Sequence, residues 1–153
     1  MVDYDIATED DLSTIKELFQ EYGSSMGIDL SFQDFAAELA ALPGKYAPPD
    51  GAVIIARLQG TPCGCVALRR IDQNACEMKR LYVRPDTRGL GIGAELVKRI
   101  IDLARSKGYR SMRLDTLPSM KSAVSLYRLA GFKEIPAYIY NPIPGALFME
   151  KNL

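Results

Sequence analysis

Histidine is absent from all 153 residues. Its absence excludes the Ser–His and Cys–His pairs in which a neighbouring imidazole activates a nucleophile. Any general base must therefore be a carboxylate, a tyrosine, a cysteine, a lysine or a water that one of these holds. Only three cysteines occur (Cys63, Cys65 and Cys76), and without histidine they do not form a usual zinc pattern. We predict that they are small buried strand residues and that no metal is bound.

The chain also lacks an excess of either charge. Lys and Arg together number 19, as do Asp and Glu, so the formal net charge is zero. This balance argues against nucleic acid or an anionic membrane as the main partner. No apolar run approaches the roughly 20 residues that span a bilayer. The acidic start, Met1-Val2-Asp3, does not resemble a signal peptide. We expect a cytoplasmic protein with one domain over residues 1–153.

Hydrophobic periodicity predicts the order of secondary-structure elements. We expect Thr8 to cap the first helix, Gly23 to end it, and Ser31 with Asp34 to cap the second helix. Strands are expected at 2–7, 53–58, 62–70, 76–83, 109–116, 132–135 and 146–150, and helices at 8–22, 31–42, 92–107 and 117–130. The only clear strand–helix–strand crossover is 76–116, and a hairpin meander precedes it. The predicted fold is therefore α/β (α+β), with a mixed, mostly antiparallel central sheet and helices on both faces.

Three glycines at alternate positions separate the strand 76–83 from the helix that follows it. Gly89, Gly91 and Gly93 let the backbone expose its N–H groups and let a bulky ligand come close. The start of the helix adds unpaired N–H donors and the positive end of the helix dipole. Together these features predict an anion site, and phosphate is the usual occupant.

Several known glycine patterns compete for this stretch. The P-loop pattern is missing, because no Gly-Lys-Ser/Thr follows. Gly89-x-Gly91-x-x-Ala94 matches a loose dinucleotide fingerprint, and Asp115 ends the next strand, where an acidic residue would hold a ribose. That fingerprint belongs on the first strand of a repeated parallel unit, whereas a meander precedes it here. A turn that needs glycine only for packing would fit one glycine better than three.

The stretch resembles motif A of the GCN5-related N-acetyltransferases, the GNAT family. Arg88, Gly91 and Gly93 match its pattern of Arg or Gln, two residues, Gly, one residue, then Gly or Ala. Downstream, the helix with Ala123 and Leu126-Tyr127, ending in Gly131-Phe132, resembles the family's second signature. The order of elements from Val2 to Glu150 also follows the family's plan. The resemblance implies a GNAT-like acyl-CoA N-acyltransferase fold and acetyl-CoA as the co-substrate.

The resemblance also implies which residues bind the cofactor. The pyrophosphate would lie on the N–H groups from Arg88 to Ala94, and the pantetheine arm would pair with the strand at Leu81 and Val83. Met120 stands where many members carry an asparagine, so Ser119 or Ser122 is expected to replace that contact. The predicted cofactor residues are Leu81, Tyr82, Val83, Arg88, Gly89, Leu90, Gly91, Ile92, Gly93, Ala94, Ser119 and Ser122.

Two residues are predicted to be catalytic from the same resemblance. Glu77 matches the position from which a glutamate serves as base, and its spacing in a regular strand puts it on the face of Leu81 and Val83. Tyr127 matches the tyrosine that protonates the departing thiolate. The alternatives are a paired glutamate beside Lys79 and a core tyrosine.

The resemblance predicts transfer of an acetyl group to a primary amine by direct attack in a ternary complex. The acceptor is a small molecule or a peptide, framed by Tyr22, Met26, Phe32, Tyr138 and Tyr140. A homodimer is possible. The alternatives are a non-catalytic acyl-CoA-binding module and a dinucleotide-binding oxidoreductase.

Overall fold

The computed structural model describes residues 1–27 and 29–153, apart from the side chain of Phe32. The prediction that Phe32 frames the acceptor site therefore lies outside the described residues. The strands are β1 (Val2–Ile6), β2 (Ala52–Leu58), β3 (Thr61–Arg70), β4 (Ala75–Val83), β5 (Ser111–Thr116), β6 (Lys133–Ile135) and β7 (Leu147–Asn152). The helices are α1 (Leu12–Ser25), α2 (Phe35–Ala40), α3 (Ile92–Ser106) and α4 (Lys121–Leu129). Each predicted element is present, with shifts at its ends.

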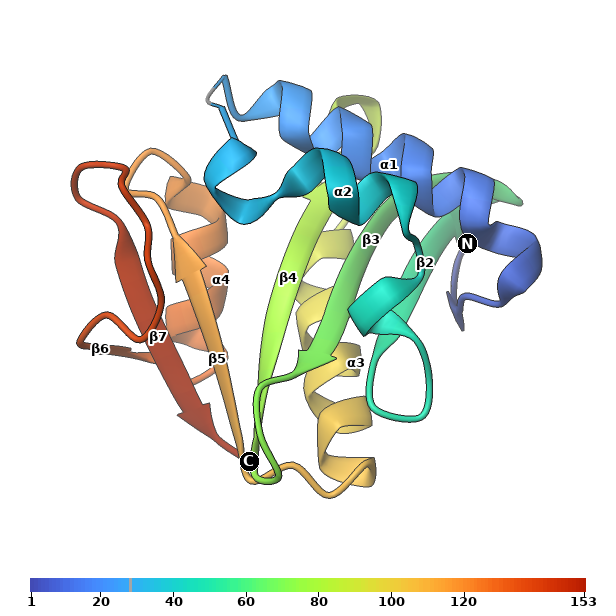
Figure 1. Ribbon diagram of the computed structural model, residues 1–153. Helices are drawn as coiled ribbons and strands as arrows, with labels where there is room; N and C mark the ends of the chain where they lie inside the picture. Colours follow the sequence, from blue (N-terminus) through green and yellow to red (C-terminus); the bar gives the residue numbers. More distant parts are fainter. Residues whose placement is uncertain (28) are drawn as a thin grey trace.

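In the described residues the strands form one sheet in the order β1-β2-β3-β4-β5-β7-β6. Only β4 and β5 are parallel, because α3 carries the chain between them; the other neighbours are antiparallel. The sheet packs α3 on one face and α1 on the other (Figure 1). The predicted mixed, mostly antiparallel sheet with helices on both faces is confirmed.

The parallel pair is joined only at its base. Residues 75–77 of β4 pair with residues 111–113 of β5, and no further pairs form between these strands in the described chain. Beyond this point the two strands diverge, β4 running toward α1 and β5 toward the loop before α4 (Figure 1). One edge of β4 from Met78 to Val83 is thus left without a strand partner. This opening determines where ligands can enter the fold.

Two buried clusters hold the layers together. On the α3 face, Leu96 and Ile100 of the helix pack with Met112 and Leu114 of β5. On the α1 face, Leu18 and Phe19 pack with Ile55 of β2. The three cysteines are buried and free, as predicted. Because both faces of the central strands are covered, the sheet is a rigid frame for the opening between β4 and β5.

The helix ends show where local sequence signals were misread. Helix α1 begins at Leu12, after a short turn that Thr8 caps reciprocally with Asp11. It passes through Gly23, where a Cβ atom would lie 2.7 Å from the ring of Phe35. Gly23 therefore does not end the helix; it allows α2 to pack closely against α1. The predicted cap of Ser31 with Asp34 is also wrong, because a 3-10 turn precedes α2 and Asp34 has a left-handed backbone.

Candidate active site

The glycine stretch forms the N-terminal end of α3. Gly91 is the N-cap residue with φ of 76°, and Gly89 has φ of 88°; both values favour glycine over other residues. Helix α3 begins at Ile92, so the backbone N–H groups of its first turn have no helical partner. These donors face a groove. The predicted anion-binding geometry is therefore present, with the dipole of a 15-residue helix behind it.

The groove runs from this helix end to β4 and has a volume of about 470 Å³. It is lined by every residue that was predicted to bind the cofactor except Leu90, which points outward and is 59% exposed. The sequence did not indicate how the rest of the wall is built. α1, the turn after β4 and the start of α4 add the remaining lining residues, which are Tyr22, Ser25, Thr87, Met120, Lys121, Ala123 and Leu126.

The unpaired edge of β4 forms the floor of this groove. Leu81 and Val83 line it, and the Nε of Arg88 donates a hydrogen bond of 3.0 Å to the carbonyl oxygen of Val83. That bond fixes the Arg88 side chain against the strand end. The other backbone groups along this edge are in place to pair with an extended ligand as an added strand would.

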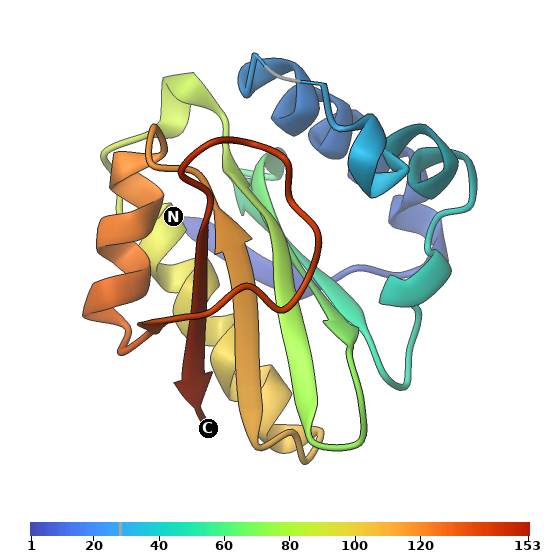
Figure 2. The same ribbon diagram turned by 60° about the vertical axis from the view of Figure 1, so that its left-hand side comes forward.

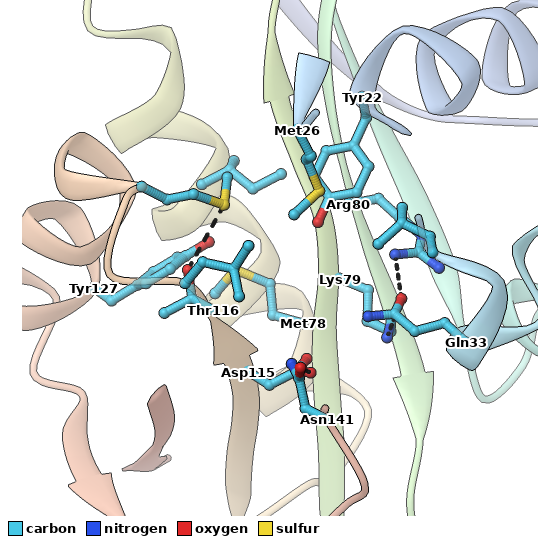
Figure 3. Close-up of a pocket in the computed structure, with 14 residues that line it drawn as sticks. Tyr22, Met26, Gln33, Met78, Lys79, Arg80, Asp115, Thr116, Tyr127 and Asn141 are labelled. Carbon is cyan, nitrogen blue, oxygen red and sulfur yellow. Dashed lines mark hydrogen bonds between the residues drawn. The ribbon is translucent and has the colours of Figure 1, made fainter. Parts of the chain in front are cut away.

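A second cavity continues from the groove into the space between β4 and β5. This acceptor cleft, as we name it, shares Tyr22, Leu81 and Met120 with the groove, so the two cavities adjoin. The cleft itself is narrow, about 30 Å³. Figure 3 shows side chains from α1, β4, β5 and the loop 136–146 converging on it. Its lining residues are Tyr22, Met26, Leu30, Gln33, Met78, Lys79, Arg80, Leu81, Asp115, Thr116, Leu117, Met120, Tyr127 and Asn141.

Tyr127 lines the cleft but not the groove. The residue is only 7% exposed, and its ring packs edge-on against Phe132 at 5.9 Å. Among the described residues its hydroxyl makes no hydrogen bond, yet it is not sealed from solvent. Burial raises the pKa of this hydroxyl, and the charge of Asp115 raises it further. Tyr127 thus keeps its proton at neutral pH and presents it to the cleft.

The expectation that Glu77 shares a face with Leu81 and Val83 is wrong. At Arg80 the strand has φ of 60°, and its register against β3 shifts by one residue between Cys65 and Ala67. This β-bulge turns Leu81 and Val83 to the α3 face, while Glu77 faces the other side of the sheet. Successive side chains of a regular strand point to opposite faces, but this alternation does not hold from Glu77 to Leu81, because the bulge inserts an extra residue.

Glu77 is buried and held by two hydrogen bonds. The Nε of Arg69 donates to one carboxylate oxygen at 2.7 Å, and the hydroxyl of Tyr138 donates to the other at 2.6 Å. Burial raises the pKa of Glu77, but the charges of Lys79 and Arg69 and these hydrogen bonds outweigh it and give a net lowering. The group is therefore an ionised anchor for Tyr138, and it does not line the described part of either cavity.

The residues expected to frame an acceptor are only partly brought together. Tyr22 and Met26 line the cleft (Figure 3). Tyr138 lies against Glu77, and Tyr140 is 72% exposed. The loop that carries both tyrosines, residues 136–146, crosses in front of β4 and β5 (Figure 2). Asn141 of this loop donates a hydrogen bond of 3.0 Å to Asp115, a contact that sequence reasoning missed.

A groove at a helix N-terminus that opens into a splayed parallel strand pair defines an acyl-CoA N-acyltransferase type of fold, and comparison with known proteins agrees. Residues 12–132 match the "Acetyltransferase (GNAT) family". An uncharacterized N-acetyltransferase of Schizosaccharomyces pombe is 48% identical over 145 residues, which are 94% of this chain and 89% of that protein. The chain belongs to the GNAT acetyltransferase family.

Solved structures agree on the fold. An acetyltransferase of the GNAT family from Staphylococcus aureus superposes with a TM-score of 0.81 at 21% identity, over 99% of both chains. A protein from Salmonella typhimurium, determined with its cofactor acetyl-CoA, gives a TM-score of 0.68 at 20% identity, covering 99% of this chain and 94% of that one. In the described residues no helix is long and apolar enough to cross a membrane, and no group of three metal-ligating side chains occurs.

Proposed function

We propose that the protein transfers the acetyl group of acetyl-CoA to a primary amine by direct attack while both substrates are bound. The observation that carries this proposal is that the groove and the cleft adjoin, and that Tyr127 lines the cleft. In this proposal the groove binds the phosphate-bearing cofactor, and the acceptor approaches from the cleft. The one-domain organisation over residues 1–153, the cytoplasmic location and a homodimer stay predictions.

In this proposal the N–H groups at the start of α3 bind the pyrophosphate, and the edge of β4 at Leu81 and Val83 pairs with the pantetheine arm. Gly89 and Gly91 leave the approach to these donors open, since a Cβ atom at either position would meet no neighbour within 4 Å. Ser119 and Ser122 lie in the groove wall at the start of α4, where they replace the missing asparagine contact. The bound cofactor supplies a thioester, whose carbonyl carbon is the electrophile.

The chemistry requires a free amine and a protonated leaving group. The amine nitrogen forms a bond to the carbonyl carbon, the carbon–sulfur bond breaks, and the sulfur takes the electron pair. The nitrogen releases one proton to solvent, which leaves a neutral amide and balances the proton that Tyr127 gives up. Tyr127 donates its proton to that sulfur, which makes the leaving group a neutral thiol. Burial raises the pKa of this hydroxyl, so Tyr127 carries its proton at neutral pH.

The role of Glu77 follows from its contacts. The predicted role as base stays a prediction, but both carboxylate oxygens are already engaged by Arg69 and Tyr138. We propose that Glu77 is a positioning residue that holds the 136–146 loop against the sheet. Asn141 is the second attachment of the same loop, through Asp115 on β5. The two bonds together fix the loop over the acceptor cleft.

Two measurements test the proposed function. Acetyl-CoA should raise the melting temperature, whereas NAD should not, because ligand binding to the folded state stabilises it. Release of free CoA thiol should then depend on added amine. Stabilisation by acetyl-CoA without release of thiol for any amine would favour the non-catalytic acyl-CoA-binding alternative. Stabilisation by NAD alone would favour the oxidoreductase.

Two glycines, one before α3 and one after it, give a matched pair of variants that tests the cofactor loop. Gly91→Ala should weaken acetyl-CoA binding at least tenfold, because a left-handed backbone costs a non-glycine residue roughly 1–2 kcal/mol and the loop will shift to relieve it. Gly108→Ala is the control, since Gly108 has φ of 91° and, like Gly91, no neighbour within 4 Å of an added Cβ atom. Calorimetric titration should show weaker binding for the first variant only. Equal affinities in both variants would contradict the placement of the pyrophosphate.

A further inference from the structure

The acceptor cleft is lined by three charged side chains, and one of them already forms an ion pair within the fold. Arg80 is 2% exposed, and its guanidinium donates to both carboxylate oxygens of Glu38, at 2.9 and 3.0 Å. It also donates to the Oε1 of Gln33 at 2.7 Å and lies over the ring of Phe35. Arg80 therefore ties α2 to the bulge of β4, and its charge is already balanced by Glu38.

Lys79 is a different case, because it is a buried cation with no carboxylate in direct contact. Only 6% of the residue is exposed, and its one hydrogen bond among the described residues runs over 3.3 Å to the Oε1 of Gln33, an oxygen that Arg80 already uses. Burial lowers the pKa of Lys79, and the charges of Glu77 and Asp115 partly offset this, although Glu77 directs its two oxygens to Arg69 and Tyr138. Buried lysines are rarely left unpaired. Two of its three N–H donors are thus available to a negative group in the cleft.

Asp115 is the corresponding anion on the opposite wall. It lies on β5, across the cleft from Lys79 on β4 (Figure 3), and accepts one hydrogen bond from Asn141 at 3.0 Å. Among the described residues it forms no ion pair. A carboxylate has two oxygens and can accept further hydrogen bonds. The cleft therefore has a positive side chain on one wall and a negative side chain on the other, and neither forms a direct ion pair among the described residues.

We propose that the acceptor is a free amino acid, with its amino group at Asp115 and its carboxylate at Lys79. This inference rests on the proposed acetyl transfer, which requires an amine at this place. A molecule that carries both charges satisfies both walls at once, whereas a polyamine would place a second positive charge against Lys79.

Matched pairs of acceptors test whether the enzyme requires a carboxylate on the acceptor. Thiol release should be measured with the free L-amino acids and with the amide of each active one, an amide that keeps the amine and loses the negative charge. We expect kcat/KM to be at least tenfold higher for the acid than for its amide, as charge-assisted hydrogen bonds contribute in this range. Polyamines should be poorer acceptors than the amino acid.

Variants then test whether the carboxylate of the acceptor binds at Lys79 and its amino group at Asp115. Lys79→Met keeps the length of the buried side chain and should remove the preference for the acid over the amide, about tenfold or more. Asp115→Asn should lower kcat/KM for the acid and the amide alike. Lys98→Met, an exposed position on α3, is the control and should change neither value. The melting temperature with acetyl-CoA shows that each variant is folded and binds the cofactor.

The inference and the proposed function fail in different ways. Thiol release with amides, peptides or polyamines but not with amino acids would overturn the inference and leave acetyl transfer in place. An unchanged preference for the acid in Lys79→Met would also overturn it. If no tested amine led to thiol release and acetyl-CoA did not stabilise the protein, the proposed function itself would be overturned.

Discussion

Tyr127→Phe should lower turnover by about 100-fold or more and leave the dissociation constant for acetyl-CoA nearly unchanged. General acid catalysis contributes roughly 10²–10⁴-fold, and this hydroxyl is the only atom that the substitution removes. Among the described residues the hydroxyl has no hydrogen bond within the protein, so its loss should not disturb the packing of the ring on Phe132. Steady-state release of CoA thiol gives turnover, and calorimetric titration gives the affinity.

Tyr109→Phe is a matched control for this prediction. Tyr109 is buried to the same extent, at 8% exposed, but its hydroxyl donates a 2.7 Å hydrogen bond to the carbonyl oxygen of Asp50, away from the cleft. Its loss should reduce stability by about 1 kcal/mol and leave turnover intact. If Tyr127→Phe kept wild-type turnover, the thiolate would have to take its proton from another source, and Tyr127 would be a core residue.

Local sequence patterns were sufficient to predict the turn and the helix that form one wall of the groove. Gly89, Gly91 and Gly93 stand at alternate positions, and a glycine-rich turn into an amphipathic helix has a geometry that depends little on distant residues. The order of strands and helices followed from periodicity for a similar reason. The side chain of Leu90 lies outside the groove lining, because a contiguous range does not say which side chains of a turn point outward; its backbone N–H group stays a predicted donor.

The acceptor side could not be predicted, because it depends on long-range contacts. After the bulge at Arg80, the side chains of β4 point to the face opposite to the one that regular alternation would give. The bulge is stabilised by Glu38, which lies 42 positions earlier in the chain. Asn141 meets Asp115 across 26 positions, in a loop that has no periodic pattern. A charged residue inside a strand, such as Lys79, gives no local signal of being buried. Only the tertiary structure shows that its nearest carboxylate is already engaged.

Glu77→Gln should lower kcat/KM for the acceptor by about 100-fold, mainly through a higher KM, while acetyl-CoA affinity stays the same. The substitution leaves the Arg69 guanidinium without its counter-ion and weakens the bond that anchors Tyr138. Since each lost charge-assisted hydrogen bond is worth about 1.5–3 kcal/mol, the 136–146 loop should no longer be held over the cleft. The folded protein should also lose stability, which a melting curve will measure.

The pH dependence separates this positioning role from the predicted role as base. The pKa of Glu77 is lowered in the folded protein, so its stabilising effect is complete above the ordinary glutamate range and is lost as pH falls through the lowered value. Near neutral pH a positioning role therefore predicts a constant deficit in Glu77→Gln. A missing base would instead give a deficit that shrinks as pH rises, because more of the amine is then free without help.

Two further variants complete the comparison. Tyr138→Phe removes only the hydroxyl that binds Glu77, and it should reproduce much of the KM effect if the loop is what matters. Asp11→Asn breaks the ion pair with Arg57 at 2.8 Å, far from the cleft, and should lower stability without changing KM. A wild-type KM in Tyr138→Phe, together with recovery of Glu77→Gln at high pH, would make Glu77 the base. A raised KM in both Glu77→Gln and Tyr138→Phe at every pH makes Glu77 the residue that positions the acceptor loop.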